Sequence, residues 1–542
     1  MRTLKIQNLI IVLMLLITAS CKKAAVNQDN DRDSLQKQQA VTELNTKYYV
    51  SAAGNDANNG TSTSTPWKTL NKVSTSTFGA GDQILFRSGD TFVGQLQVSS
   101  SGSSGSPIIF DKYGTGAKPI IDGANAAGGA YGAAVIATNK QYIEFRNLEI
   151  TNNRTVNRSG VDKATAYGIL ISNTSATAKQ YFRFTGLTIR NIYAVSIAGV
   201  AFNAISSSGI RIDGPGLTQD IRVDNCLITR TTRFGVSSSN TMDLVISNNQ
   251  MTETGGSGIQ PKQAENILME NNTFDYPGSN IDPRMTARGS AVWIADCKDV
   301  VLQKNISRHV RGPQDSYGYH IDHDNTNILY QYNISQDAEG GFVEILGLNK
   351  NVTYRFNISI NDGNRADAKT LWLSTYGGSD NPGGGPSDRV YIYNNTVYVN
   401  GKTPNIDLST GTNVHVFNNI FHVASGSIGQ TTNIKPGTDI SNNLFFGDVN
   451  TTFVSSSTSS YTGDAKFTSP TAADAPLGFR LLAGSPALNR GKGFSVPTFP
   501  KAGTGIFSGI PTNAPSLNVD YFGNAVNISG PVNIGAYNGA GL

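Results

Sequence analysis

The chain has 542 residues, and its charge balance excludes a typical nucleic-acid-binding protein. Lys and Arg total 43 against 39 Asp and Glu, which gives a net charge of +4, and only 15% of residues are charged. A nucleic-acid binder would show a clustered basic excess. With 57 Gly, 38% hydrophobic and 9% aromatic residues, the composition indicates turn-rich β-structure rather than disorder. The three cysteines are too few for a disulfide scaffold or a Cys-rich zinc site.

The first 20 residues predict a secretion signal. Basic residues precede an apolar run over 9–17, and small residues at 18–20 stand directly before Cys21. The run is too short to span a membrane. The small residues before Cys21 resemble a bacterial lipobox, which implies lipidation of Cys21, and an ordinary cleaved signal is the alternative. Residues 21–47 are polar and predict a flexible tether. We therefore expect a cell-envelope, outer-membrane lipoprotein that contacts the membrane only through its lipid anchor.

A short motif of alternating apolar residues around an Asn recurs along the chain. Its Asn lies at Asn147, Asn225, Asn249, Asn272, Asn305, Asn333, Asn357, Asn395, Asn419 and Asn443. From Asn225 onward most copies are 23 or 24 residues apart, and longer intervals mark loop insertions. Each period holds short strands with period-two alternation and no helical stripe. Such coils bury their inner face only by stacking, so the sequence predicts a β-solenoid in which the Asn amides bond from coil to coil.

These repeats resemble the right-handed parallel β-helix superfamily of pectate-lyase-like proteins. The resemblance implies an all-β fold in which residues 48–450 form the β-helix. Thr65 and Pro66 are predicted to cap a short helix that plugs the N-terminal end of the solenoid. Residues 451–542 resemble the C-terminal closing segment of such proteins, and we expect a monomer.

A second strand follows each Asn motif, and it predicts an outward row of side chains. Aligning its apolar residues pairs Ile321 with Val343. The outward row is then Trp293, Asp322, Glu344 and Trp372. Asp322 and Glu344 are one coil apart, so their carboxyl groups are expected roughly 5 Å apart, as in retaining glycosidases. Asp324, one diagonal step away, would leave the longer gap of an inverting pair.

The predicted row has the side chains that glycoside hydrolysis needs. Stacked carboxylates raise each other's proton affinity, so that one can serve as an acid while the other stays ionised. Trp293 and Trp372 offer apolar faces to sugar rings. His320 is a candidate general base or a hydrogen-bonded structural histidine. The alternative for the carboxylates is an ordinary solvated face. The hydrolase hypothesis requires no cofactor, although Asp322 and Asp324 could hold Ca²⁺; the spacing matches neither an EF-hand nor a closed zinc site, so no metal is assigned.

Two short motifs carry a further resemblance. A Gly-x-x-Ile-Asp strand ends at Asp322, and Phe-Val-Glu344 follows one coil later. This pair resembles the β-helical β-xylosidase family, which implies that Asp322 is the nucleophile and Glu344 the acid/base. The segment 311–374 also resembles secreted β-helix proteins of polysaccharide-degrading Bacteroidota-type bacteria.

Basic residues form a second candidate set for substrate binding. Its members are Lys262, Arg284, Arg311 and Arg365. Lys262 and Arg284 are 22 residues apart and resemble the Lys/Arg pair of β-helical alginate and chondroitin lyases, where a base removes the proton α to a uronate carboxylate. The sequence favours a two-carboxylate glycoside hydrolase that acts on a polysaccharide or oligosaccharide. A uronate lyase that uses Lys262, Arg284 or His320 and a non-catalytic glycan-binding solenoid are the alternatives.

Overall fold

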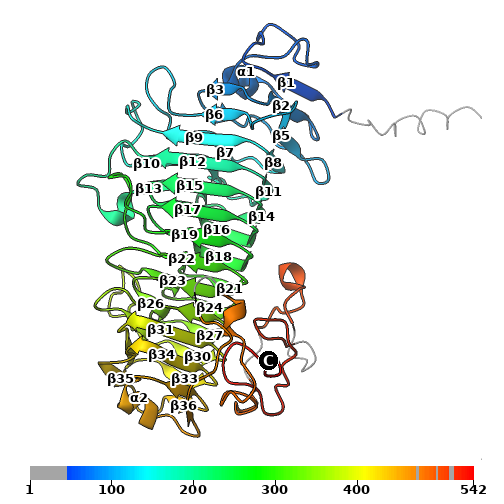
Figure 1. Ribbon diagram of the computed structural model, residues 1–542. Coiled ribbons are helices and arrows are strands. Elements are labelled where there is room, and N and C mark those ends of the chain that lie inside the picture. The colour runs from blue at the N-terminus through cyan, green and yellow to red at the C-terminus, as the bar shows by residue number, and fades with distance from the viewer. Residues whose placement is uncertain (1–44, 472–474, 496–498, 512–517) are drawn as a thin grey trace, which may run out of the picture. The chain divides into compact units, whose positions relative to one another are not determined.

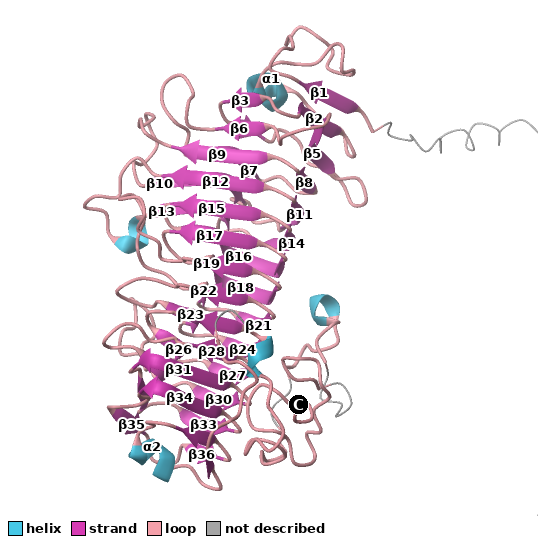
Figure 2. Ribbon diagram, viewed as in Figure 1, coloured by secondary structure: helices cyan, strands magenta, loops and turns pink. Residues whose placement is uncertain are grey.

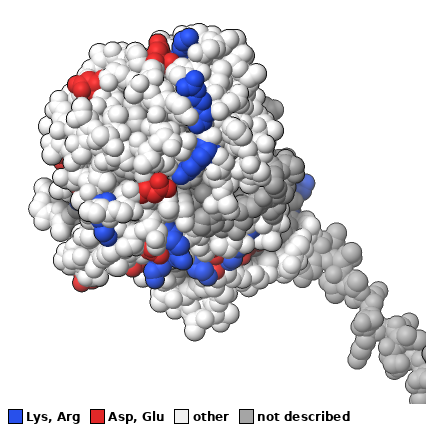
Figure 3. Space-filling model, turned by 90° about the horizontal axis from the view of Figure 1, so that it is seen from below, with Lys and Arg blue, Asp and Glu red and all other residues white. Residues whose placement is uncertain are grey.

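Parallel strands make up nearly all the regular structure of the computed structural model (Figure 1, Figure 2). It describes residues 45–471, 475–495, 499–511 and 518–542. The predicted signal, the tether up to residue 44 and Cys21 lie outside these residues. No helix among them is long and apolar enough to span a bilayer. On the face shown in Figure 3, most of the surface is uncharged, as the low charged fraction of the sequence predicts.

The strands stack into three parallel ladders, one on each side of the β-helix. The first ladder contains β1 (Lys47–Val50), β2 (Gln83–Arg87), β5 (Ile108–Tyr113), β8 (Ile143–Arg146), β11 (Lys179–Thr185), β14 (Thr218–Asp224), β21 (Lys298–Gln303), β24 (Thr326–Gln331), β27 (Lys350–Arg355), β30 (Asp388–Tyr393), β33 (Thr412–Phe417) and β36 (Asp439–Ser441). The second contains β4 (Leu96–Gln97), β7 (Ala133–Thr138), β10 (Thr165–Ser172), β13 (Ser206–Asp213), β20 (Val292–Ile294), β23 (Tyr317–Ile321), β26 (Gly341–Ile345), β29 (Lys369–Leu373), β32 (Asn405–Leu408) and β35 (Thr432–Ile434). Two long strands, β16 (Phe234–Ser247) and β18 (Ile259–Glu270), run through both ladders and join them into one sheet.

The third ladder is a separate sheet that closes the coil. It contains β3 (Thr91–Val93), β6 (Ile120–Asp122), β9 (Glu149–Asn153), β12 (Thr188–Tyr193), β15 (Leu227–Thr231), β17 (Gln250–Thr254), β19 (Thr273–Asp275), β22 (Ile306–Arg308), β25 (Ile334–Gln336), β28 (Ile358–Ile360), β31 (Thr396–Lys402), β34 (Ile420–Gly426), β37 (Leu444–Phe446) and β38 (Tyr461–Thr462). The strands thus begin at Lys47 and end at Thr462, and the predicted all-β parallel β-helix is confirmed.

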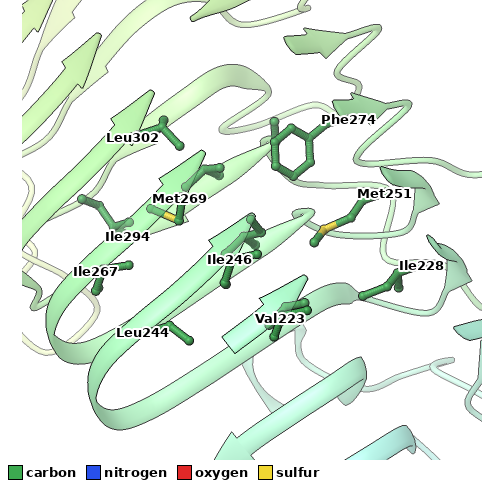
Figure 4. Close-up of a cluster of buried hydrophobic side chains, with 14 of the residues drawn as sticks. Val223, Ile228, Leu244, Ile246, Met251, Ile267, Met269, Phe274, Ile294 and Leu302 are labelled. Carbon is green, nitrogen blue, oxygen red and sulfur yellow. The ribbon is translucent and has the colours of Figure 1, made fainter. Parts of the chain in front are cut away.

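The core lies between the ladders, where equivalent residues of successive coils stack on one another. Figure 4 shows aliphatic and aromatic side chains from all three ladders pointing into this interior. Along the first ladder, register places Val223, Ile246, Met269 and Leu302 in one fully buried column. Each such side chain stabilises the fold by roughly 1.5–3 kcal/mol relative to exposure. A coil therefore gains most of its stability from the two coils beside it.

A buried asparagine ladder ties the coils together, as the repeat predicts. Each Nδ2 donates a hydrogen bond to Oδ1 of the next Asn at 3.0 to 3.2 Å. The ladder comprises Asn249, Asn272, Asn305, Asn333, Asn357, Asn395, Asn419 and Asn443. Asn147 and Asn225 do not belong to it, contrary to the sequence alignment. They have φ of 52° and 53° and occupy the left-handed position just before the ladder, which Asn tolerates well. At the ladder position itself, the backbone N–H of Cys226 donates to Asn249 Oδ1 at 2.9 Å.

Short helices cover both ends of the core. At the N-terminal end, α1 (Leu70–Thr75) buries Leu70 and Val73, and its cap is Thr69 rather than the predicted Thr65. The Thr69 hydroxyl accepts from the backbone N–H of Lys72 at 3.1 Å. At the other end, Phe453 of α2 (Thr451–Ser455) packs against the last core phenylalanines.

The first part of the predicted closing segment 451–542, α2, covers the end of the core, whereas the described segment after β38 does not stay at that end. It runs back along the outside of the coils (Figure 1). Phe494 packs on the outward rings of Tyr393 and Phe417, with ring centroids 4.8 and 6.0 Å away. Phe507 of the single-turn helix η3 (Gly505–Phe507) joins a cluster with Val301. The physical reason is that outward apolar side chains of the first and third ladders would otherwise be exposed to water.

The asparagine ladder predicts that an Asn→Ala substitution lowers the free energy of unfolding more inside the ladder than on the surface. In Asn357→Ala, the backbone N–H and Nδ2 of Asn333 lose their acceptor, Asn357 Oδ1, inside the core. Stranding buried donors should lower the free energy of unfolding by about 2–4 kcal/mol. The control is Asn400→Ala, because Asn400 accepts an exposed hydrogen bond from Ser425. Denaturant unfolding should show a large loss for the first variant and a small one for the second. Equal midpoints would contradict the structural role of the ladder.

Candidate functional site

The outward row on the second ladder differs from the predicted one by one member. Register pairs Trp293 with His320, His320 with Glu344 and Glu344 with Trp372. His320, not Asp322, is therefore the neighbour of Glu344. The alignment of Ile321 with Val343 is wrong, because Ile321 pairs with Ile345.

A buried tyrosine causes this difference. Tyr319 occupies the inward position opposite Val343, where the neighbouring coils have aliphatic residues. Its hydroxyl donates to the carbonyl of Ile334 at 2.8 Å, so the polar group is satisfied within the core. A tyrosine at a core position has no signature in period-two patterning, which is why the sequence alignment slipped by two residues.

Asp322 lies directly after β23 and faces outward on the same side as His320. Its backbone N–H still belongs to the ladder and donates to the carbonyl of Ile294 at 3.0 Å. The carboxylate accepts the indole N–H of Trp293 at 2.7 Å and the backbone N–H of His323 at 3.0 Å. A second, shorter asparagine ladder fixes the backbone here, because Asn325 and Asn349 both donate to the carbonyl of Asp322. Asp322 is thus held from both its side chain and its backbone.

His320 and Glu344, which are neighbours in this row, form a buried pair. His320 Nδ1 lies 3.2 Å from Glu344 Oε2, and the side chains are 0% and 1% exposed. The imidazole also stacks on the Trp293 indole, with ring centroids 5.1 Å apart and planes inclined by 9°. Burial raises the pKa of Glu344 well above its usual range, with Asp315 and Asp322 adding repulsion. Burial likewise lowers the pKa of His320. At neutral pH both shifts favour an uncharged pair with Glu344 protonated.

A cavity of about 910 Å³ opens over this row. Three carboxyl groups line it, from Asp315, Asp322 and Glu344. Sequence reasoning missed Asp315, because this residue lies in the loop between β22 and β23 and has no counterpart in the repeat. Asp315 pairs with the guanidinium of Arg288 and is 15% exposed, which makes it more accessible than Glu344. The cavity therefore brings together more acidic groups than the row alone predicts.

Both predicted tryptophans line the cavity, but each has a neighbour on its ring. His320 stacks on Trp293, and the Lys369 ammonium lies 4.1 Å from the centroid of the Trp372 ring. Sugar stacking is thus confined to the remaining ring surface. The loop after β29 completes the wall, since residues 374, 376, 378 and 379 also line the cavity.

The predicted basic residues separate into two groups. Lys262 lines the cavity, whereas Arg284, Arg311 and Arg365 do not. Arg284 pairs with Asp282, Arg311 with Asp337 and Arg365 with Asp367, as in ordinary surface ion pairs. Despite their 22-residue spacing, Lys262 and Arg284 are not neighbours in the ladder, because Lys262 pairs with Ser239 and Ala295. Arg284 instead lies in the long loop between β19 and β20.

Among the described residues, two side-chain groups have metal-ligand atoms within 4.8 Å of one another. One consists of Asp315, His320 and Glu344, and the other of Asp296, His323 and Asp324. Asp324 accepts from His323 Nδ1 at 2.9 Å and does not line the cavity, whereas Asp322 does. Each group supplies two carboxylates and one imidazole, whereas Ca²⁺ takes six to eight oxygen ligands, so neither group by itself forms a calcium cage.

The buried Glu344 predicts a pH-dependent effect of its neutral variant. The unfolded chain releases this proton above about pH 4.5, whereas the folded chain retains it, so its burial costs more stability as pH rises. The melting temperature of Glu344→Gln minus that of the wild type should therefore be larger at about pH 8 than at about pH 5. The control is Glu253→Gln, which also removes one carboxylate but at an exposed ion pair with Arg230. If this difference in melting temperature became smaller as pH rises, the result would contradict a raised pKa for Glu344.

The comparisons with known proteins agree with the fold. A family model for the right-handed β-helix region matches residues 133–381. A curated lacto-N-biosidase from Bifidobacterium longum subsp. longum is 25% identical over 488 residues, which cover 70% of this chain. The match spans only 29% of the length of that relative.

Solved structures show the same architecture. The GH136 lacto-N-biosidase from Eubacterium ramulus is 21% identical, with a TM-score of 0.51 over 74% of this chain and 70% of that chain. A mannuronic acid specific polysaccharide family 6 lyase from human gut microbiota is 13% identical, with a TM-score of 0.48 over 71% of this chain and 87% of that chain. Together with the three parallel ladders, the match to the family model shows that the chain has a right-handed β-helix fold.

Proposed function

We propose that the chain is a carbohydrate-active enzyme that hydrolyses a glycosidic bond of an oligosaccharide or polysaccharide in this cavity. The observation that carries the proposal is the convergence of three carboxyl groups and two tryptophans on one cavity. The similarity to a curated lacto-N-biosidase and to the solved GH136 lacto-N-biosidase supports it. Attachment to the cell envelope through Cys21 is a separate proposal, supported by the sequence of residues 1–21.

Asp322 supplies one of the two carboxyl groups that glycoside hydrolysis requires. Both of its oxygens accept N–H donors, from Trp293 and from the His323 backbone, and this arrangement holds it as an acceptor. Such a carboxylate can attack the anomeric carbon or stabilise the positive charge that develops there. The Trp293 donor and the pinned backbone also limit its freedom to move, which favours a productive geometry.

The second carboxyl group protonates the leaving oxygen as the bond from the anomeric carbon to that oxygen breaks. Burial raises the pKa of Glu344, which favours the protonated form that an acid needs. Asp315 has the better access to a bound glycan, because it is 15% exposed against 1% for Glu344. The residue that acts as the acid must contact the glycosidic oxygen, so substitution of Glu344 and of Asp315 in turn distinguishes the two.

Elimination at a uronate is the second candidate function. It is favoured by Lys262, which lies exposed in the cavity and could remove a proton α to a carboxylate once deprotonated. The partner predicted for it, Arg284, lies outside the cavity and pairs with Asp282. Hydrolysis therefore has the more complete set of residues.

The test follows two products of glycan cleavage at once. The protein is incubated with neutral, amino-sugar-containing and uronate-containing glycans, and new reducing ends are measured together with ultraviolet absorbance from a conjugated double bond. Reducing ends without that absorbance are expected. Asp322→Asn should lower the rate by about 10²–10⁴-fold, and the acid is whichever of Glu344→Gln and Asp315→Asn causes a comparable loss. Asp324→Asn, one diagonal step away but outside the cavity, should retain activity.

Three results would contradict hydrolysis by these groups. Reducing ends and absorbance that rise together would show elimination. Full activity of Asp322→Asn would place the chemistry elsewhere. Glycan binding without any cleavage across the panel would favour the non-catalytic solenoid.

A further inference from the structure

The cavity has a basic end as well as an acidic one. Beside the carboxyl groups, four cationic side chains line it, from Arg211, Arg233, Lys262 and Arg288. Arg211 faces outward from β13 next to Ser237 of β16, and Lys262 faces outward from β18 next to Ser239. These strands precede β20 and β23 in the ladder, so the basic end lies on the coils N-terminal to Asp322.

Two of the four cations already have a carboxylate partner. Arg211 Nε lies 2.9 Å from Asp213, and Arg288 pairs with Asp315. No carboxylate of the described residues lies within 4 Å of the cationic nitrogens of Arg233 or Lys262. The basic end therefore has two positive charges that the protein itself does not neutralise.

Arg233 is partly buried against two aromatic rings, and its hydrogen-bond donors are incompletely satisfied. Its guanidinium lies 4.2 Å from the Phe202 ring centroid and 4.4 Å from that of Phe234, and it donates to the carbonyl of Ile205 at 2.6 Å. Among the described residues its buried Nε has no hydrogen-bond partner. Burial, followed by repulsion from Arg211 and Arg288, lowers its pKa to about 10. A desolvated cation beside other cations is costly unless an anion accompanies it.

Serine hydroxyls line the cavity together with these two cations. Ser206, Ser207 and Ser208 come from β13, and Ser237 and Ser239 come from β16, where Ser239 is the strand neighbour of Lys262. The Ser207 hydroxyl is buried, and within the described part of the chain it has no hydrogen-bond partner. Guanidinium, ammonium and hydroxyl groups together match the several oxygens of a carboxylate or a sulfate.

We propose that this end of the cavity binds an acidic substituent of the glycan, a carboxylate or a sulfate, through Arg233, Lys262 and the neighbouring serine hydroxyls. The inference rests on the proposed function in that the cavity is taken to bind a glycan, but it does not depend on the reaction that follows. It makes the substrate an acidic glycan whose charged residue lies on the coils N-terminal to the reacting bond.

The test measures binding separately from turnover. Inorganic sulfate and glucuronate are each titrated into the purified protein by calorimetry, with glucose as the neutral counterpart. Saturable binding of at least one anion is expected, weakening with added salt because the contact is ionic. Lys262→Met should weaken the binding at least about tenfold, and Arg233→Gln should do so more strongly. The two titrations distinguish a sulfate from a carboxylate as the preferred group.

Matched variants exclude a general charge effect. Lys350→Met and Arg222→Gln each remove one exposed cation on the first ladder, away from the cavity. They should leave anion binding unchanged. Because Arg233 packs against two aromatic rings, its variant is interpreted only if it melts as the wild type does, and the exposed Lys262 supplies the independent test.

Absence of saturable binding for both anions, or equal weakening in the Lys350 and Lys262 variants, would overturn the anion site. That result would leave hydrolysis of neutral glycans intact. Anion binding that depends on Lys262 in a protein without glycan turnover would instead refute the enzyme and support the site, so the two failures are distinguishable.

Discussion

The hydrogen bond from one buried asparagine amide to the next is the interaction on which the rest of this structure depends. It joins coil to coil at a fixed point of the turn, from Asn249 to Asn443, and thereby sets where each strand begins. Once that point is fixed, the strands before and after it can pair only in one register, because a one-residue slip would turn the apolar side chains outward. The ladder thus converts a repeat in the sequence into columns of side chains on the three faces.

The candidate site is assembled across coils and not within one. Trp293, His320, Glu344 and Trp372 each come from a different strand of the second ladder, and they are adjacent only because those strands stack in register. The site also contains costly features. A glutamate whose pKa is raised by burial and a histidine whose pKa is lowered by burial lie together in the interior, and an arginine is desolvated near other cations. The stacked core around them stabilises the fold enough to hold such groups in place.

The charge arrangement gives the cavity a direction along the solenoid axis. Carboxyl groups gather on the later coils and unpaired cations on the earlier ones. A chain-like ligand that lies across successive coils would meet both ends, which joins the proposed cleavage and the proposed anion contact in one mode of binding. The aromatic rings at Trp293 and Trp372 lie on the acidic part of this path.

The repeat was readable in the sequence because its physics is local and periodic. Alternating apolar residues, Gly-rich turns and a recurring Asn predicted the parallel β-helix, and the ladder from Asn249 to Asn443 has the predicted bonds. Patterning failed where one residue type can occupy two environments. Tyr319 is a core residue with a satisfied hydroxyl, and Asn225 is a turn residue one step before the ladder.

The sequence by itself determined the fold class, the inward and outward alternation of each strand, and the presence of Trp293, Glu344 and Trp372 on one outward row. Only the tertiary structure decided that His320 lies next to Glu344, that Asp315 and Arg233 enter the cavity from loops, and that Arg284, Arg311 and Arg365 lie outside it. The reason is that stacking fixes strands through a repeating pattern, whereas loops and ion pairs are placed by contacts between residues far apart in the chain, which leave no period to read.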